Sequence, residues 1–127
     1  MTTPGAKTHL RIARPSRDLA AAERFWVDGV GLEVLYRATE GHRLLMVGWQ
    51  NGGWHLELVE DSDLEPRPTE EDLLVLYLGQ PPADELLARL SSSGGREVPA
   101  RNPYWDEWGV TFQDPDGYRL VLSHRDW

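Results

Sequence analysis

The chain has 127 residues, of which 40% are hydrophobic and 27% are charged, values typical of a soluble globular domain. Its net charge of −8 disfavours nucleic-acid binding, and the absence of cysteine excludes disulfides and thiolate chemistry. The longest aliphatic run, residues 73–78, is too short to span a membrane, and the first residues lack the apolar segment of a secretory signal, so we expect a cytoplasmic location.

The first half of the chain has the pattern of a βαβββ unit. Alternating apolar and polar residues predict the strands, and a helix with Trp26 on its apolar face follows Ser16 or Asp18, either of which can cap it. The sequence "NGG" at 51–53 is typical of a hairpin turn. The predicted strands cover 8–14, 32–38, 42–50 and 54–60, and the helix covers 18–30.

The second half repeats this order. A helix entered through proline ends at two glycines, and "PDG" at 115–117 forms the last turn. A polar, proline-broken linker at 61–71 separates the halves. The predicted strands cover 72–79, 96–100, 108–114 and 118–124, and the helix covers 82–93.

The two halves are also related residue by residue. "GWHLELV" at 53–59 and "GYRLVLS" at 117–123 match at an offset of 64 residues. Two more pairs keep this offset: "GLEV" (31–34) with "GREV" (95–98), and "THLRIA" (8–13) with "DLLVLY" (72–77). The sequence therefore predicts one α+β domain of curved mixed sheets, built from a module at 1–64 and a module at 65–127.

Two motifs carry a family resemblance. "DLAAAERFWVDGVGLEVL", after a short strand, and "WGVTFQDPDGYRLVL", near the end, resemble the vicinal oxygen chelate superfamily, which includes glyoxalase I, extradiol dioxygenases and bleomycin-resistance proteins. The resemblance covers nearly the whole chain. It implies the glyoxalase/bleomycin-resistance fold and a homodimer. Each curved sheet then forms a cleft, here called a cup, that the other subunit completes.

The resemblance also implies a metal position in each cup. Family enzymes hold one divalent metal with a His or a carboxylate from the first and last strand of each module. These positions are His9 and Glu57 in the first module and, by the offset of 64, Leu73 and Val121 in the second. Leu73 and Val121 have no lone pairs to donate, and His55 is at most a third ligand. We therefore expect no metal cofactor; the alternative is one divalent metal at His9 and Glu57.

His9 and Glu57 also have structural interpretations. His9 can be an ordinary histidine on a strand. Glu57, between two leucines, must find a cation, a donor or water, and it can pair with Arg11 or Arg119.

Aromatic residues gather near predicted turns. Trp49 flanks the "QNGG" hairpin, and Tyr104, Trp105 and Trp108 follow Pro103 in a stretch expected to be irregular. In bleomycin-resistance proteins, the aromatic residues at the positions of Tyr36 and Trp108 help to line the drug groove.

Three functions remain open. The first is a non-catalytic protein that sequesters an aromatic or cationic small molecule, such as an antibiotic, as drug-resistance proteins do. The second is a metal-dependent glyoxalase-like lyase or dioxygenase, and the third is a partner-binding scaffold. The negative charge is either a solubility device or an attraction for a cationic ligand. The candidate ligand-binding residues are His9, Arg11, Tyr36, Trp49, His55, Glu57, Tyr104, Trp105 and Trp108.

Overall fold

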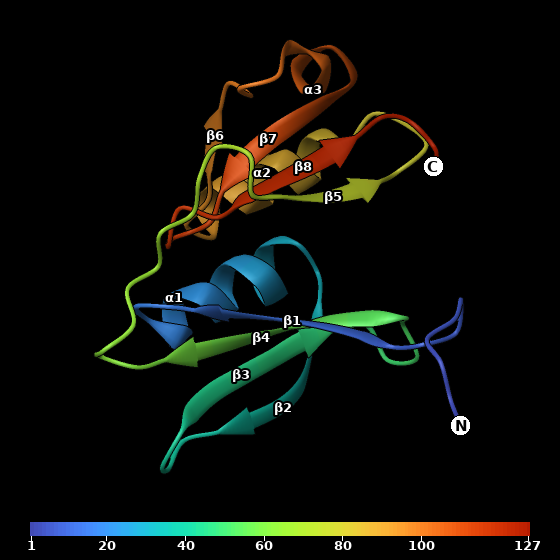
Figure 1. Ribbon diagram of the computed structural model, residues 1–127. Helices are drawn as coiled ribbons and strands as arrows, with labels where there is room; N and C mark the ends of the chain where they lie inside the picture. The colour runs from blue at the N-terminus through green and yellow to red at the C-terminus, as the bar shows by residue number, and fades with distance from the viewer.

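The computed structural model describes all 127 residues and contains two four-stranded sheets, one from each half of the chain (Figure 1). The first half contains β1 (Leu10–Pro15), α1 (Leu19–Glu23), η1 (Arg24–Gly29), β2 (Glu33–Ala38), β3 (Arg43–Gly48) and β4 (Trp54–Glu60). The second half contains β5 (Leu73–Tyr77), α2 (Asp84–Ser92), β6 (Arg96–Val98), α3 (Pro103–Trp108), β7 (Gly109–Gln113) and β8 (Arg119–Ser123). None of the helices is long and apolar enough to cross a membrane.

The two sheets share one topology. Their strand orders are β1-β4-β3-β2 and β5-β8-β7-β6, with the first and last strands of each half parallel and the other pairs antiparallel. One face of each sheet packs on the helices: Leu56 and Leu58 of β4 and Leu120 and Leu122 of β8 are at most 1% exposed and share a core with Phe25. Two βαβββ modules with mixed sheets are therefore confirmed.

Local signals explain most boundaries. The Asp18 side chain accepts a hydrogen bond from the Ala21 amide and caps α1, and the helical run continues as one π-helical segment, η1. Asn51 has φ 63° in the predicted hairpin turn, and Gly117 has φ 93° in the "PDG" turn. The β4 strand has the predicted bounds, because alternation and a tight turn define it from both sides.

One segment differs from its prediction. The stretch containing Tyr104, Trp105 and Trp108 is not irregular but forms α3. The Asn102 side chain accepts a hydrogen bond from the Tyr104 amide at 3.0 Å, and Pro103 takes the first helical position, where its missing N–H costs nothing.

The strand register corrects the comparison of the two modules. Arg11 pairs with His55 in the first sheet, whereas Leu73 pairs with Arg119 in the second. The offset of 64 holds between β4 and β8, but the first strands are related by 73 − 11 = 62 residues. The counterpart of Leu73 is therefore Arg11 and not His9, which precedes β1.

A buried polar network joins the two modules. Asp114 is 4% exposed and accepts hydrogen bonds from Trp26 Nε1 at 3.1 Å and from the amides of Asp116 and Tyr118. Asp116 in turn accepts from the Ser16 hydroxyl at 2.6 Å. The turn before β8 is thus fastened to the start of the first helix, which fixes the orientation of one module on the other.

Candidate functional site

The face of the first sheet that the helices leave open carries the candidate site. Side chains that are directly paired across strands share a face, so Ala13, Glu57, Met46 and Tyr36 form one row from β1 to β2. Tyr36 is 56% exposed, and Glu57 lies in the middle of the row with its side chain 15% exposed. This face offers a ring, a thioether and a carboxylate side by side.

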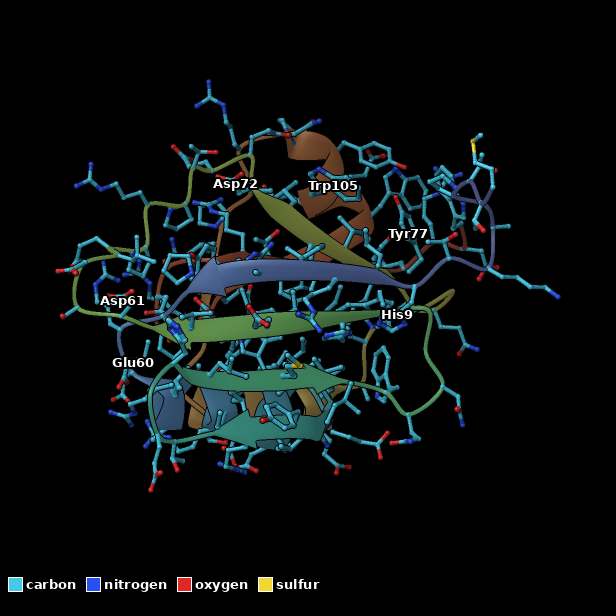
Figure 2. The ribbon with its side chains drawn as sticks, turned by 60° about the horizontal axis from the view of Figure 1, so that its bottom comes forward. His9, Glu60, Asp61, Asp72, Tyr77 and Trp105 are labelled. Carbon is cyan, nitrogen blue, oxygen red and sulfur yellow. The ribbon has the colours of Figure 1, made fainter.

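Arg11 is at the centre of the polar part of this face. Its Nε donates to His55 Nε2 at 3.1 Å and its Nη1 to Glu57 Oε1 at 3.2 Å. His9 Nε2 lies 2.6 Å from His55 Nδ1, with the two ring centroids 4.8 Å apart. We call these four residues the Arg11 cluster. His9 marks the end where β1 begins, and Glu60 marks the opposite end of the sheet (Figure 2).

The cluster determines the protonation of His55. Burial lowers the pKa of His55, the charges of His9 and Arg11 lower it further, and Glu57 opposes them. His55 is therefore a neutral imidazole at pH 7. Because a guanidinium can only donate, Nε2 of His55 must accept, so the ring proton is on Nδ1 and is donated to His9. Both ring nitrogens of His55 are thus engaged within the protein.

A divalent metal does not fit these donors. The side chains of His9, His55 and Glu57 do not converge on a common point suited to a metal ion. Arg11, a permanent cation, takes the lone pair of His55 Nε2 and bonds to one oxygen of Glu57, so its positive charge stands where a metal would have to bind. At the register-related positions Arg11, Glu57, Leu73 and Val121, the only group able to bind a metal is the carboxylate.

The corresponding face of the second sheet is closed. Val121 and Ser123 are 0% exposed and Arg119 is 7% exposed. The Arg119 side chain donates to the Pro99 carbonyl at 3.2 Å and lies 3.6 Å from the Glu70 carboxylate. Segments of the same chain therefore cover the face that stays open in the first module.

The predicted aromatic residues lie apart from the Arg11 cluster. Tyr104, Trp105 and Trp108 are on α3, which packs against β7 and β8 at the end of the second sheet farthest from the first (Figure 1). Trp49 packs edge-on against Trp54 and donates from Nε1 to the Gly31 carbonyl, beside the end of η1. Of the nine predicted residues, the structure brings together His9, Arg11, Tyr36, His55 and Glu57 on one face.

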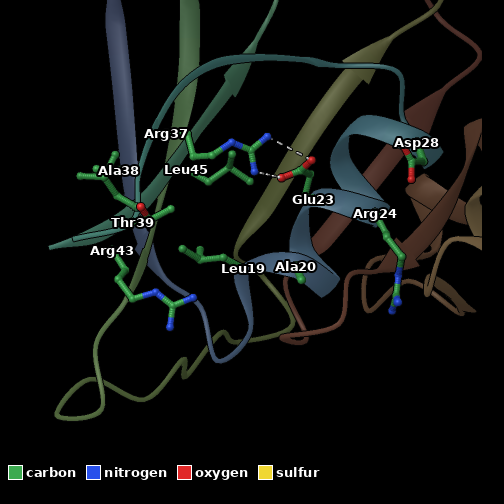
Figure 3. A pocket seen from close by; sticks show the side chains of 11 residues that line it. Leu19, Ala20, Glu23, Arg24, Asp28, Arg37, Ala38, Thr39, Arg43 and Leu45 are labelled. Carbon is green, nitrogen blue, oxygen red and sulfur yellow. Dashed lines mark hydrogen bonds and ion pairs between the residues drawn. The ribbon is translucent and has the colours of Figure 1, made fainter. Parts of the chain in front are cut away.

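A separate cavity of about 370 Å³ lies between α1 and the β2–β3 hairpin (Figure 3). Arg37 and Glu23 form a two-contact ion pair across it, at 2.6 and 3.3 Å, above a floor that includes Leu19 and Leu45. None of the nine predicted residues lines this cavity. It is on the helix side of the sheet, so it is not an extension of the Arg11 cluster.

Sequence reasoning missed Met46 and Gly48 on the open face. Alternation in β3 places them on one face, but only the pairing with β4 shows that this is the face of Glu57 and His55. Gly48 is paired with His55, and a Cβ on Gly48 would lie 2.9 Å from His55 Cβ and 3.2 Å from the Trp54 carbonyl oxygen.

Gly48→Ala is therefore expected to destabilise the protein by about 1–3 kcal/mol. The backbones of β3 and β4 and the His55 side chain must shift to admit one methyl group. Urea unfolding measures the loss. Gly53→Ala is the matched control, since nothing lies within 4 Å of its Cβ position and it should change stability far less. Equal losses in the two variants would contradict the close packing of His55 on Gly48.

Comparison with known proteins adds two family matches. A family model described as the YycE-like N-terminal domain matches residues 10–59, and one described as the YycE-like C-terminal domain matches residues 71–124. The uncharacterized protein YycE of Bacillus subtilis (strain 168) is 38% identical over 122 residues, covering 91% of this chain and 86% of YycE.

Solved structures agree with these matches. A crystal structure of YycE from Bacillus subtilis has a TM-score of 0.80 at 33% identity, covering 95% of this chain and 92% of that one. TnmS3, an antibiotic-binding protein from Streptomyces sp. CB03234, has a TM-score of 0.65 at 27% identity, covering 97% and 100%. Glyoxalase I of Leishmania major has a TM-score of 0.71 at 17% identity, covering 94% and 88%, which shows the shared fold alone. The resemblance predicted from the two sequence motifs is thereby confirmed.

Proposed function

Because the chain belongs to the YycE-like family and has the glyoxalase/bleomycin-resistance fold, we propose that it is a non-catalytic protein that sequesters an aromatic small molecule such as an antibiotic. The observation that carries this proposal is the position of Arg11. Its guanidinium bonds to both His55 and Glu57, so an internal cation occupies the place where a metal enzyme of this fold needs an open coordination site. A protein that only binds its ligand needs affinity and no reactive group. Side chains that already have hydrogen-bond partners within the protein, as His55 and Glu57 have, are therefore compatible with this function.

The composition of the open face favours a flat ligand with hydrogen-bond acceptors. Arg11 is 52% exposed at its side chain and keeps free donors, and the rings of His9 and Tyr36 offer stacking surfaces. The composition suggests two ligand classes, aromatic and cationic. The aromatic class is favoured because Arg11 already neutralises Glu57, the one carboxylate of the cluster. The similarity to TnmS3 supports an antibiotic as one such ligand.

We also propose that the binding unit is a homodimer. Within one chain, the aromatic side chains of α3 and the Arg11 cluster lie on different sheets, and a second copy can bring α3 of one subunit over the open sheet of the other. Light scattering at micromolar concentration should therefore give the mass of a dimer, and a monomer would contradict this arrangement.

Binding is tested by titrating tryptophan fluorescence with a panel of aromatic natural products. We expect saturable quenching by at least one compound, and an affinity at least about tenfold weaker in Arg11→Met, because the donors to the ligand are lost. Arg24→Met is the matched control: it removes the same charge from an exposed residue outside the open face and should bind normally.

The alternative function, a metal-dependent lyase or dioxygenase, is tested on the same preparation. Elemental analysis of purified protein should find no stoichiometric zinc, nickel, manganese or iron. Stoichiometric metal together with metal-dependent turnover, and no quenching by any compound, would overturn the binding proposal in favour of the enzyme.

A further inference from the structure

We propose a second ligand site, a small-oxyanion site that binds a carboxylate or phosphate group through Arg14 and Arg67. It is a cavity of about 410 Å³ between the end of β1 and the linker that joins the modules, and Tyr118 forms part of its wall. The inference does not depend on the proposed function, because Arg14 points to the opposite face of β1 from Arg11.

Arg14 is held in place by an aromatic ring. Its guanidinium carbon lies 4.7 Å from the centroid of the Tyr118 ring, a cation–π contact. The Tyr118 hydroxyl already donates to the Pro15 carbonyl at 3.0 Å, so this ring cannot rotate away without losing a hydrogen bond. The charged group is therefore positioned before any ligand arrives.

The donors of Arg14 lack partners. Nη1 of Arg14 is buried and has no hydrogen-bond partner, and Arg14 forms no ion pair. Arg67 lines the same cavity and also forms no ion pair. A buried N–H donor without an acceptor costs about 1–3 kcal/mol, and an arginine cannot escape this cost by losing its proton. Nε and Nη2 of Arg14 also have no hydrogen-bond partner and are not buried, so a bound oxyanion can supply acceptors to them.

Asp72 is the one carboxylate that lines the cavity, and one of its two oxygens is already hydrogen-bonded within the linker. Its Oδ2 accepts from the Thr69 amide at 2.6 Å, and this bond is the main reason that the pKa of Asp72 is lowered; Arg14 contributes less. In Figure 2, Asp72 lies where the linker enters β5. Two arginines against one aspartate leave the cavity positive on a chain whose net charge is −8.

The planar guanidinium specifies the chemistry of the ligand. Arginine donates two parallel N–H bonds that match the oxygens of a carboxylate or a phosphate. A second arginine across the cavity favours a compact anionic group over a neutral one. The site therefore takes either a carboxylic acid or a phosphorylated small molecule, and both chemistries need testing.

The test titrates the full chain with inorganic phosphate and, separately, with succinate, at an ionic strength kept constant with sodium chloride. NMR follows the Nε–H resonances of the arginines. We expect the Arg14 resonance to shift saturably with at least one probe, and the dissociation constant to rise at least about tenfold in Arg14→Gln and in Arg67→Gln. Saturation by phosphate alone assigns a phosphorylated ligand, and saturation by succinate alone assigns a carboxylic acid.

Arg24→Gln is the control for charge, and its dissociation constant should equal that of the unaltered protein. Arg67 is exposed, so Arg67→Gln keeps the test valid even where Arg14→Gln fails to fold. The proposal is overturned by a lack of saturation with both probes, or by an equal loss of affinity in Arg24→Gln and Arg67→Gln, which would indicate general screening and no site.

Discussion

Asp114→Asn is expected to remove a pH-dependent contribution to stability of about 3 kcal/mol that the Asp114 carboxyl makes at acidic pH and that is lost by pH 7. Burial raises the pKa of Asp114 to about 6 from 3.8, with the Asp116 charge acting in the same direction, against the hydrogen bonds that Asp114 accepts from Tyr118, Trp26 and Asp116. The folded protein therefore binds a proton at Asp114 at pH values where the unfolded chain has already released it.

The sign follows from this difference. A carboxyl with a raised pKa in the folded state favours folding fully below the unfolded pKa, near 4, and loses that contribution as the pH rises through 6. The free energy of unfolding of the unaltered protein minus that of Asp114→Asn should thus fall by about 2 kcal/mol from pH 4 to pH 7. Taking the difference cancels the titration of His55, whose lowered pKa acts in the opposite direction.

Urea unfolding at half-unit pH steps measures this difference. Asp63→Asn is the control, because Asp63 is exposed in the linker and its side chain accepts no hydrogen bond. A difference that is flat between pH 4 and pH 7, or a slope shared by Asp63→Asn, would show that Asp114 does not carry the raised pKa.

Local chemistry explains why the fold could be predicted from the sequence. The bounds of β4 follow from the alternation in Trp54–Glu60 and from the nearby turn at Asn51. The start of α1 likewise follows from a neighbouring residue, the cap Asp18. Helix α3 differs from the irregular stretch expected there: Asn102 followed by Pro103 is a helix-start signal, but the cluster of aromatic residues after it is also typical of a loop.

The candidate site depends on distances along the sequence that no local pattern encodes. The parallel pairing of β1 with β4 joins residues 44 apart, and the pairing of β5 with β8 joins residues 46 apart. This difference of two residues makes Arg11 the counterpart of Leu73, and it places the guanidinium between His55 and Glu57. Side-chain alternation along β4 is enough to place His55 and Glu57 on one face, but only the register shows which first-strand residue lies beside them.

The register also shows how a metal site could be built, and Arg11→His tests it. The substitution removes the cation and puts a lone pair opposite His55 and near Glu57, completing three ligands with an open position. Zinc affinity is expected to rise by about a hundredfold, or roughly 3 kcal/mol, over the unaltered protein. Isothermal titration calorimetry measures the change.

Arg11→Met separates the two effects of that substitution. It removes the cation without adding a ligand, so its zinc affinity should stay well below that of Arg11→His, and adding Glu57→Gln to Arg11→His should abolish most of the gain. If the unaltered protein already binds zinc as tightly as Arg11→His, then Arg11 does not exclude metal and the non-catalytic interpretation fails. If Arg11→Met gains as much as Arg11→His, then charge alone controls the site, and the position of Arg11 in the strand register has no part in metal exclusion.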